Sequence, residues 1–390
     1  MCKVSLKLFI FTWSIIVLIP SQLFAQNNFK LKYKKSDIYA GIEVGSKGVK
    51  MSLVEVSRNT QKNLEFNILK DTSVNTDFIS FTDHTYNETI KGLTGLFNNA
   101  LNDYRISSAR IFTVVSSGVK VQAEKVNKTN WIQKLVDDFR SRIGEPGRTV
   151  EVVDVLQEAR LSHLGIVPES RRYNTFLIDI GSGNTKGGYF PNGNTNDFKL
   201  FQLSWGTKST ANAAEKRLED DQTMYNFNKQ LYRVLAGSAN DEVIYAVNLS
   251  GAYNMSDNIA FSGGIAWSVA VLISPELVEN PVIPVTYPEV EKFYDRIMRN
   301  YNSLSDTEIL VPLNDPSLNK TAIAKEVKRV NSVFDQRSLL AGTGLLLKIM
   351  RQFEGVYEKK QFYLVKNGQV GWISAYVDQT ISKSGQTVSN

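Results

Sequence analysis

The sequence predicts an α/β protein built from two similar domains, each with a mixed sheet flanked by helices. Two segments about one domain apart, Gly41–Gly48 and Asp179–Lys186, carry a glycine-rich turn directly after an apolar run. Each turn lies within three successive β-type segments, and a mixture of helical and β-type patterns follows each set. This repetition favours a duplicated α/β unit over a solenoid or an all-β fold.

The first half of the chain begins with β-branched and apolar segments separated by turn residues, which predict three strands. Between Tyr86 and Tyr104, apolar residues recur every three or four positions and predict an amphipathic helix. The turn Gly144–Gly147, which contains a proline, ends a later helix. The expected strands are 38–44, 49–56, 64–73, 111–115 and 150–153, and the expected helices are 86–104, 119–126, 130–142 and 156–164.

The polar and basic segment Pro168–Tyr173 predicts a linker, after which the three-strand pattern repeats. A long helical region to about residue 234 follows the repeated strands. The expected strands are 176–180, 186–190, 198–203, 242–247, 258–261, 361–366 and 372–377, and the later helices are 265–273, 288–301, 322–334 and 337–353. We therefore expect an N-terminal domain over 37–167 and a C-terminal domain over 174–390.

The first 25 residues predict a secretory signal peptide. Lys3 and Lys7 precede an apolar run over 8–20, and the small Ala25 suits cleavage. The alternative is an uncleaved anchor, but this run is shorter than the roughly 20 residues that span a bilayer. We expect cleavage after Ala25, a secreted or periplasmic mature protein, and no later membrane span.

The composition excludes several classes of site. The single cysteine, Cys2, leaves with the signal peptide, so the mature chain has no disulfide, thiol nucleophile or zinc–thiolate centre. Removal of Lys3 and Lys7 lowers the formal net charge from +6 to +4, and mixed charges of this size do not indicate nucleic-acid binding. His84 and His163 are isolated and are expected at the surface, without a zinc site or a Ser-His-Asp triad.

The two turns have a chemistry suited to phosphate. In each, an acidic residue, Glu43 or Asp179, ends an apolar strand, and glycines then let the backbone turn tightly. Such a turn directs main-chain N–H groups toward an oxyanion, while the carboxylate can hold a divalent cation. A pair of these turns predicts a fold that closes on a phosphorylated ligand from both sides.

Further motifs lie between and after the turns: Glu158-Ala-Arg160, then Ser117–Lys128, Ser262–Trp267 and Asp335–Gly342. Together with the turns, their order and spacing resemble the exopolyphosphatase/guanosine-pentaphosphate phosphatase (Ppx/GppA) family of the actin-like, sugar-kinase superfamily. The resemblance covers nearly the whole mature chain and corresponds to the short, two-domain form. It implies two duplicated ribonuclease-H-like (actin-like ATPase) domains with mixed sheets flanked by helices and an interdomain cleft.

The resemblance also implies roles for individual residues. Glu158 matches the family's catalytic glutamate, which orients or deprotonates the attacking water. Glu43 and Asp179 would hold Mg²⁺ directly or through water. The implied phosphate-binding residues are Gly45, Ser46, Lys47, Gly181, Ser182, Gly183, Asn184, Thr185, Lys186, Ser262 and Gly263.

The chain departs from the family pattern at three places. Glu43 stands where the first turn normally has Asp, and Lys47-Gly48 replaces the usual Asn-Ser. Lys186 occupies a position that is usually acidic. Either the lysines replace part of the metal's charge on a polyanionic substrate, or metal-assisted hydrolysis has been lost and binding remains. The simpler alternative is that the side chains of Lys47 and Lys186 point into solvent.

The leading hypothesis is an exported exopolyphosphatase-like phosphohydrolase that uses Mg²⁺ to release terminal phosphate from polyphosphate or a related polyphosphorylated compound. The alternative is a non-catalytic sensor or scaffold that binds the same polyanions. Export and the Glu-Ala-Arg segment disfavour a filament-forming or chaperone ATPase. The expected partner is the polyanionic ligand rather than nucleic acid, and a homodimer is left open.

Overall fold

The computed structural model describes residues 29–57, 66–251, 256–354, 359–366, 368 and 371–387. The predicted signal peptide, residues 1–25, lies outside these ranges. None of the helices within them combines the length and the apolar character that crossing a bilayer requires.

The strands and helices alternate along the chain as an α/β fold requires. The strands are β1 (Ser36–Val44), β2 (Gly48–Ser57), β3 (Phe66–Asn75), β4 (Ile111–Val115), β5 (Val150–Val152), β6 (Thr175–Ile180), β7 (Thr185–Tyr189), β8 (Lys199–Leu203), β9 (Asn258–Ser262), β10 (Val282–Val285) and β11 (Gln361–Val365). The helices are α1 (Asp83–Asn98), α2 (Ser117–Lys125), α3 (Thr129–Ile143), α4 (Val155–Ile166), α5 (Thr207–Glu215), α6 (Met224–Ala236), α7 (Ser238–Ser250), α8 (Gly264–Ile273), α9 (Tyr287–Arg299), α10 (Lys320–Val333), α11 (Gln336–Glu354) and α12 (Gly371–Thr387).

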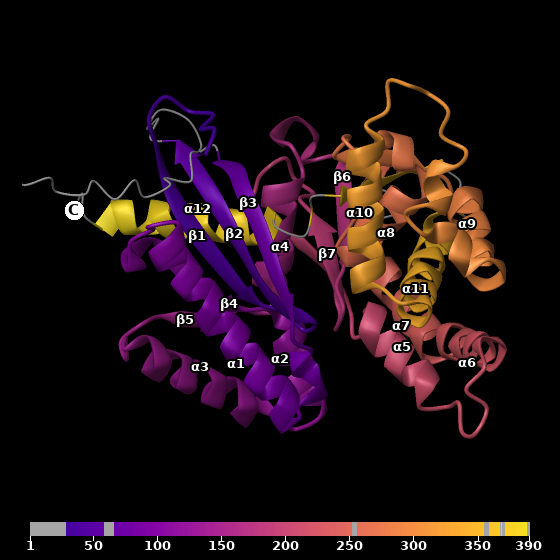
Figure 1. Ribbon diagram of the computed structural model, residues 1–390, viewed down its shortest axis with the longest axis horizontal. Coiled ribbons are helices and arrows are strands. Elements are labelled where there is room, and N and C mark those ends of the chain that lie inside the picture. Colours follow the sequence, from indigo (N-terminus) through magenta and orange to yellow (C-terminus); the bar gives the residue numbers. More distant parts are fainter. Residues whose placement is uncertain are drawn as a thin grey trace, which may run out of the picture.

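The strands form two mixed sheets that repeat one topology (Figure 1). The first sheet has the order β3-β2-β1-β4-β5, and the second, read from its other edge, has the order β8-β7-β6-β9-β11-β10. In both sheets the first three strands along the chain are antiparallel neighbours, and the fourth runs parallel to the first. The predicted fold class of two duplicated mixed-sheet domains is therefore confirmed.

Each domain has its own apolar core. In the first, the sheet packs against α1 and α3, and Phe97 and Phe139 are fully buried in that layer. In the second, Phe176 on β6 lies among Tyr189, Phe201 and Phe353, all within ring-contact distance. These cores hold the sheets rigidly, which fixes the ends of β1 and β6 where the predicted turns begin.

Two predicted strands are wrong. Residues 242–247 lie in α7, where the buried Ala239, Val243, Ala246 and Val247 follow the three-or-four spacing of a helix. Residues 372–377 lie in α12, and nearly all of them are buried. A short, continuously apolar run has no period that separates strand from helix, so its sequence pattern is ambiguous. The short strand β10 was not predicted.

The last helix departs from the predicted division at 37–167 and 174–390. Although α12 follows the second domain in sequence, it packs on α4 and on β1 of the first sheet (Figure 1). At the crossing of α4 and α12, a Cβ placed on Gly165 would lie 2.7 Å from the carbonyl carbon of Gly371. The two helices approach this closely because both residues are glycines, and α12 thereby completes the first domain.

Candidate active site

The two predicted turns form equivalent hairpins. The β1–β2 hairpin pairs Val44 with Val49, and the β6–β7 hairpin pairs Ile180 with Thr185, so each encloses a four-residue turn. Each turn is closed by one hydrogen bond, from Gly45 N–H to the Gly48 carbonyl at 2.9 Å and from Gly181 N–H to the Asn184 carbonyl at 3.0 Å.

The turns present free main-chain donors. Within the described ranges, the N–H groups of Ser46, Lys47, Ser182 and Gly183 donate no hydrogen bond to another residue. Consecutive N–H groups of this kind form a concave binding site for an anion. Both turns line one cavity of about 400 Å³ between the domains. The geometry therefore supports the predicted phosphate-binding role of the turns.

The tips of the two turns meet at the floor of the cleft. A Cβ placed on Gly183 would lie 2.6 Å from Ser46 Oγ, so only glycine fits here without displacing the facing loop. Gln122 of α2 also donates from Nε2 to the Gly183 carbonyl at 2.6 Å. These contacts link the first domain to the second beneath the cavity.

Glu158 lies on the first turn of α4, which Asp154 caps by accepting a hydrogen bond from Gln157 N–H at 2.7 Å. The carboxylate is almost fully buried but lines the cavity. Its Oε2 accepts a hydrogen bond from Ser117 N–H at 2.6 Å, at the N-terminus of α2. Its Oε1 lies 2.9 Å from Lys186 Nζ. The predicted catalytic residue is therefore held in one orientation.

Lys186 connects Glu158 to Asp179. Its ammonium lies 2.7 Å from Asp179 Oδ2 on the neighbouring strand, and only 4% of the residue is exposed. Burial alone would lower the pKa of Lys186, but the charges of Asp179 and Glu158 raise it well above its usual range. The side chain is thus a permanent cation between two carboxylates rather than a solvent-exposed lysine.

Glu43 occupies the equivalent position to Asp179 on the first hairpin. Its Oε2 accepts a hydrogen bond from Trp372 Nε1 of α12 at 3.2 Å. Burial raises the pKa of Glu43, and the charge of Lys50 opposes that shift. The returning C-terminal helix therefore contributes directly to the site.

The predicted metal ligands do not fit a directly bound Mg²⁺ in this arrangement. Asp179 Oδ1 accepts a hydrogen bond from Ser262 Oγ at 3.1 Å, and the ammonium of Lys186 lies 2.7 Å from Oδ2, on the side where a metal ion would have to bind. Among the residues of the described ranges, no group of three or more His, Cys, Asp and Glu side chains is arranged to hold a metal ion. The cation that lies between Asp179 and Glu158 is Lys186.

Most predicted site residues line the cavity. These are Glu43, Gly45, Ser46, Lys47, Glu158, Asp179, Gly181, Ser182, Gly183, Asn184, Lys186 and Gly263. Thr185 and Ser262 do not line it, and their expected role as direct phosphate ligands stays a prediction. Thr185 is fully buried and donates to the Trp205 carbonyl at 2.7 Å, and Ser262 is fully buried against Asp179. Their hydroxyl groups form hydrogen bonds to other residues of the protein and do not line the cavity.

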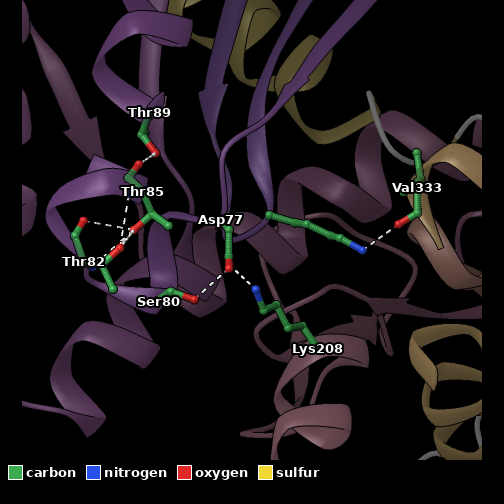
Figure 2. Close-up of polar contacts among 8 residues, drawn as sticks. Asp77, Ser80, Thr82, Thr85, Thr89, Lys208 and Val333 are labelled. Carbon is green, nitrogen blue, oxygen red and sulfur yellow. Dashed lines mark hydrogen bonds and ion pairs between the residues drawn. The ribbon is translucent and has the colours of Figure 1, made fainter. Parts of the chain in front are cut away.

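Three side chains bridge the mouth of the cleft. Lys208 of α5 pairs with Asp77, which follows β3, as Figure 2 shows. Lys47 donates to the Val333 carbonyl at 2.7 Å, and Arg329 lies 3.2 Å from Asp71. Burial lowers the pKa of Lys47. In this state Lys47 therefore spans the domains instead of pointing into solvent.

Three residues of the candidate site were not predicted from the sequence: Lys50, Gln122 and Trp372. Lys50 lines the cavity and lies opposite Glu43 in the hairpin, as Lys186 lies opposite Asp179. The signal was available, because seven positions separate the acid from the lysine in both hairpins. Gln122 and Trp372 carry no comparable local signal, because only tertiary packing brings α2 and α12 to the cleft.

The predicted surface position is correct for His84 and wrong for His163. His163, on the face of α4 turned toward the second sheet, is fully buried, and Nε2–H donates to the Thr175 carbonyl at 3.0 Å. Phe190 packs edge-on against the ring, with centroids 4.9 Å apart. His163 is therefore buried among apolar residues although histidine is a polar residue.

The buried imidazole predicts acid sensitivity. Burial lowers the pKa of His163 from 6.5 to about 4, so the unfolded chain binds a proton that the folded chain does not over this range. This contribution is fully present above pH 6.5 and is lost as the pH falls toward 4, a change of about 3 kcal/mol at most.

We expect His163→Gln, which keeps a side-chain N–H but does not titrate, to flatten the decline of unfolding temperature between pH 7 and pH 4.5. The exposed His84→Gln variant is the matched control. An unchanged decline in His163→Gln would contradict the assignment.

No protein-family model matches the sequence, and no curated protein matches it. Solved structures do match. A Ppx/GppA family member from Aquifex aeolicus is 16% identical, with a TM-score of 0.58 over 90% of this chain and 99% of its own. An exopolyphosphatase from Cytophaga hutchinsonii is 12% identical, with a TM-score of 0.59 over 88% and 98%. An exopolyphosphatase-like protein is 14% identical, with a TM-score of 0.59 over 89% and 98%.

At these identities the comparisons concern the fold. The matches extend over nearly the full length of both partners, as the motif order predicted. The chain therefore has the two-domain fold of the Ppx/GppA and exopolyphosphatase structures, and the resemblance inferred from its paired turns is confirmed at that level.

Proposed function

We propose that this protein is a phosphohydrolase that releases terminal phosphate from polyphosphate or a related polyphosphorylated compound. The observation that carries the proposal is the meeting of two turns with free N–H donors over a cavity that Glu158 lines. Preorganised donors of this kind stabilise the charge that develops on a transferred phosphoryl group. The predicted signal peptide supports action outside the cytoplasm.

In the proposed reaction, the turn amides and Lys50 hold the terminal phosphate so that its bridging oxygen points away from Glu158. A water molecule beside Glu158 attacks the phosphorus in line, and the new P–O bond forms as the bridging P–O bond breaks. Glu158 accepts the proton of the water, since each of its oxygens has a second lone pair beyond those used by Ser117 and Lys186. The shortened chain leaves with the bridging oxygen.

The test is phosphate release from long-chain polyphosphate by residues 26–390, measured with Mg²⁺ and with EDTA. Turnover that disappears in Glu158→Gln supports a hydrolase. A second function, polyanion binding without turnover, is favoured by the engagement of both Glu158 oxygens. It predicts no phosphate release from a preparation that still binds polyphosphate in equilibrium dialysis.

Lys50 provides a further test of the binding site. It lines the cavity and has no ion pair within 4.0 Å among the described residues, so its charge is available to a ligand. We expect Lys50→Gln to weaken tripolyphosphate binding about tenfold, as the loss of one charge-assisted hydrogen bond does, with little change in thermal stability.

Lys91→Gln, which removes an exposed charge from α1 outside the cavity, is the matched control for calorimetric titrations. Equal affinities of the two variants would place the ligand elsewhere.

A further inference from the structure

The duplicated hairpins place two lysines at equivalent positions of the cleft. The register pairs Glu43 with Lys50 in the first hairpin and Asp179 with Lys186 in the second. Directly opposed residues of an antiparallel pair have their Cβ atoms about 4.5–5.5 Å apart on one face of the sheet. The acidic residue of each hairpin therefore has a lysine directly opposite it on the neighbouring strand.

Lys186 occupies the place that a metal ion would need. Its Nζ lies 2.7 Å from Asp179 and 2.9 Å from Glu158, between the two carboxylates. A Mg²⁺ bound by the same oxygens would lie about 2.0–2.1 Å from each. Because this position nearly coincides with the ammonium, sterics and like charge exclude the metal while Lys186 stays in place.

Other carboxylate oxygens of the site also accept hydrogen bonds. Glu158 Oε2 accepts one from Ser117 N–H, Asp179 Oδ1 accepts one from Ser262 Oγ, and Glu43 Oε2 accepts one from Trp372 Nε1. Without a cation, three carboxylates facing the cavity would repel a phosphate group. Lys186 neutralises the charge between Glu158 and Asp179, and Lys50 offsets that of Glu43.

We propose that Lys50 and Lys186 act in place of a divalent cation, so that the cleft binds the phosphate groups of polyphosphate without a metal ion. The proposal takes its ligand class from the proposed function, but it concerns binding and holds whether or not the ligand is then hydrolysed.

The test is isothermal titration of the mature protein with tripolyphosphate, in EDTA and in Mg²⁺. The wild-type protein should bind tripolyphosphate in EDTA, and the ratio of its dissociation constants between the two conditions should agree within about threefold with that of the control variant below. In Lys186→Gln, two carboxylates are left without their cation. We expect binding in EDTA to weaken at least about tenfold and to be largely restored by Mg²⁺, because the metal can then occupy the position of the ammonium.

Lys208→Gln is the matched control for these titrations. It removes the same charge from the same cavity, but Lys208 pairs with Asp77 at the mouth rather than with the carboxylates of the floor. Mg²⁺ also complexes tripolyphosphate in solution, and the ratio of the Lys208→Gln dissociation constants in EDTA and in Mg²⁺ measures that effect, because this variant leaves the carboxylates of the floor with their lysine. A wild-type protein that binds tripolyphosphate only with Mg²⁺ would overturn the proposal.

A second measurement does not depend on the folding of a variant. Wild-type protein is titrated with MnCl₂ alone and followed by electron paramagnetic resonance. No saturable site tighter than about millimolar is expected, whereas one site per chain in the micromolar range would overturn the proposal. Failure of the proposed hydrolysis would appear as absent phosphate release and would leave both binding results unchanged.

Discussion

Glu158→Gln should lower the rate of phosphate release by about 10²–10⁴-fold, the range that a positioned general base contributes. The substitution keeps the shape of the side chain, and its amide oxygen can still accept from Ser117 N–H or Lys186. It removes the capacity to take a proton from water. The loss should therefore appear in kcat, while tripolyphosphate affinity stays close to that of the wild type.

The matched control is Glu151→Gln. Glu151 precedes α4 on β5 and accepts hydrogen bonds from Tyr376 Oη and Gln157 Nε2, outside the cavity. Its variant should release phosphate at the wild-type rate. If Glu158→Gln also kept a rate within about threefold of the wild type, Glu158 would not be the group that activates water.

Lys186→Met should destabilise the folded chain by about 3–5 kcal/mol, because it leaves two buried carboxylates without their cation. Both partners are almost inaccessible, with side-chain exposures of 5% for Lys186 and 2% for Glu158. Water cannot compensate for the lost ion pair at this depth. The midpoint of thermal unfolding should fall by roughly 6–20 °C, since about 1 kcal/mol corresponds to roughly 2–4 °C in a domain of this size.

Two further variants separate the ion pair from the volume of the side chain. Lys199→Met removes a largely exposed partner of Asp197 and should leave the unfolding temperature nearly unchanged. The triple variant Lys186→Met/Glu158→Gln/Asp179→Asn removes all three charges and should recover part of the loss. Equal melting of Lys186→Met and the wild type would mean that the buried cluster does not form.

The parts of the fold that were predictable from sequence are those that local chemistry determines. The two glycine turns require tight backbone geometry and end apolar strands, so both hairpins could be predicted without tertiary information. Glu158 could be placed because its motif lies in a fixed order relative to the turns. Lys186 could be singled out as unusual from the sequence. One of its carboxylate partners lies on the neighbouring strand of the hairpin, but the other lies on a helix whose position only tertiary packing defines.

Other features depended on tertiary contacts that leave no local pattern. Residues 372–377 form a helix because Trp372 and its neighbours fill the space between α4 and the first sheet, and an apolar run alone does not reveal this. His163 is buried because the second sheet packs against its face of α4. Lys50 lies in β2 beyond the first turn, and the hairpin register that pairs it with Glu43 is the one that pairs Lys186 with Asp179.

The return of α12 makes the first domain discontinuous in the chain. A newly made polypeptide cannot complete that domain until α12 has been synthesised. This helix packs on the first sheet and supplies the indole that contacts Glu43. A stop codon after residue 354 would therefore damage the opposite end of the molecule, and a cut at the 168–173 linker would not yield two self-sufficient halves. Proper assembly of the cleft thus reports that the polypeptide has been made through α12.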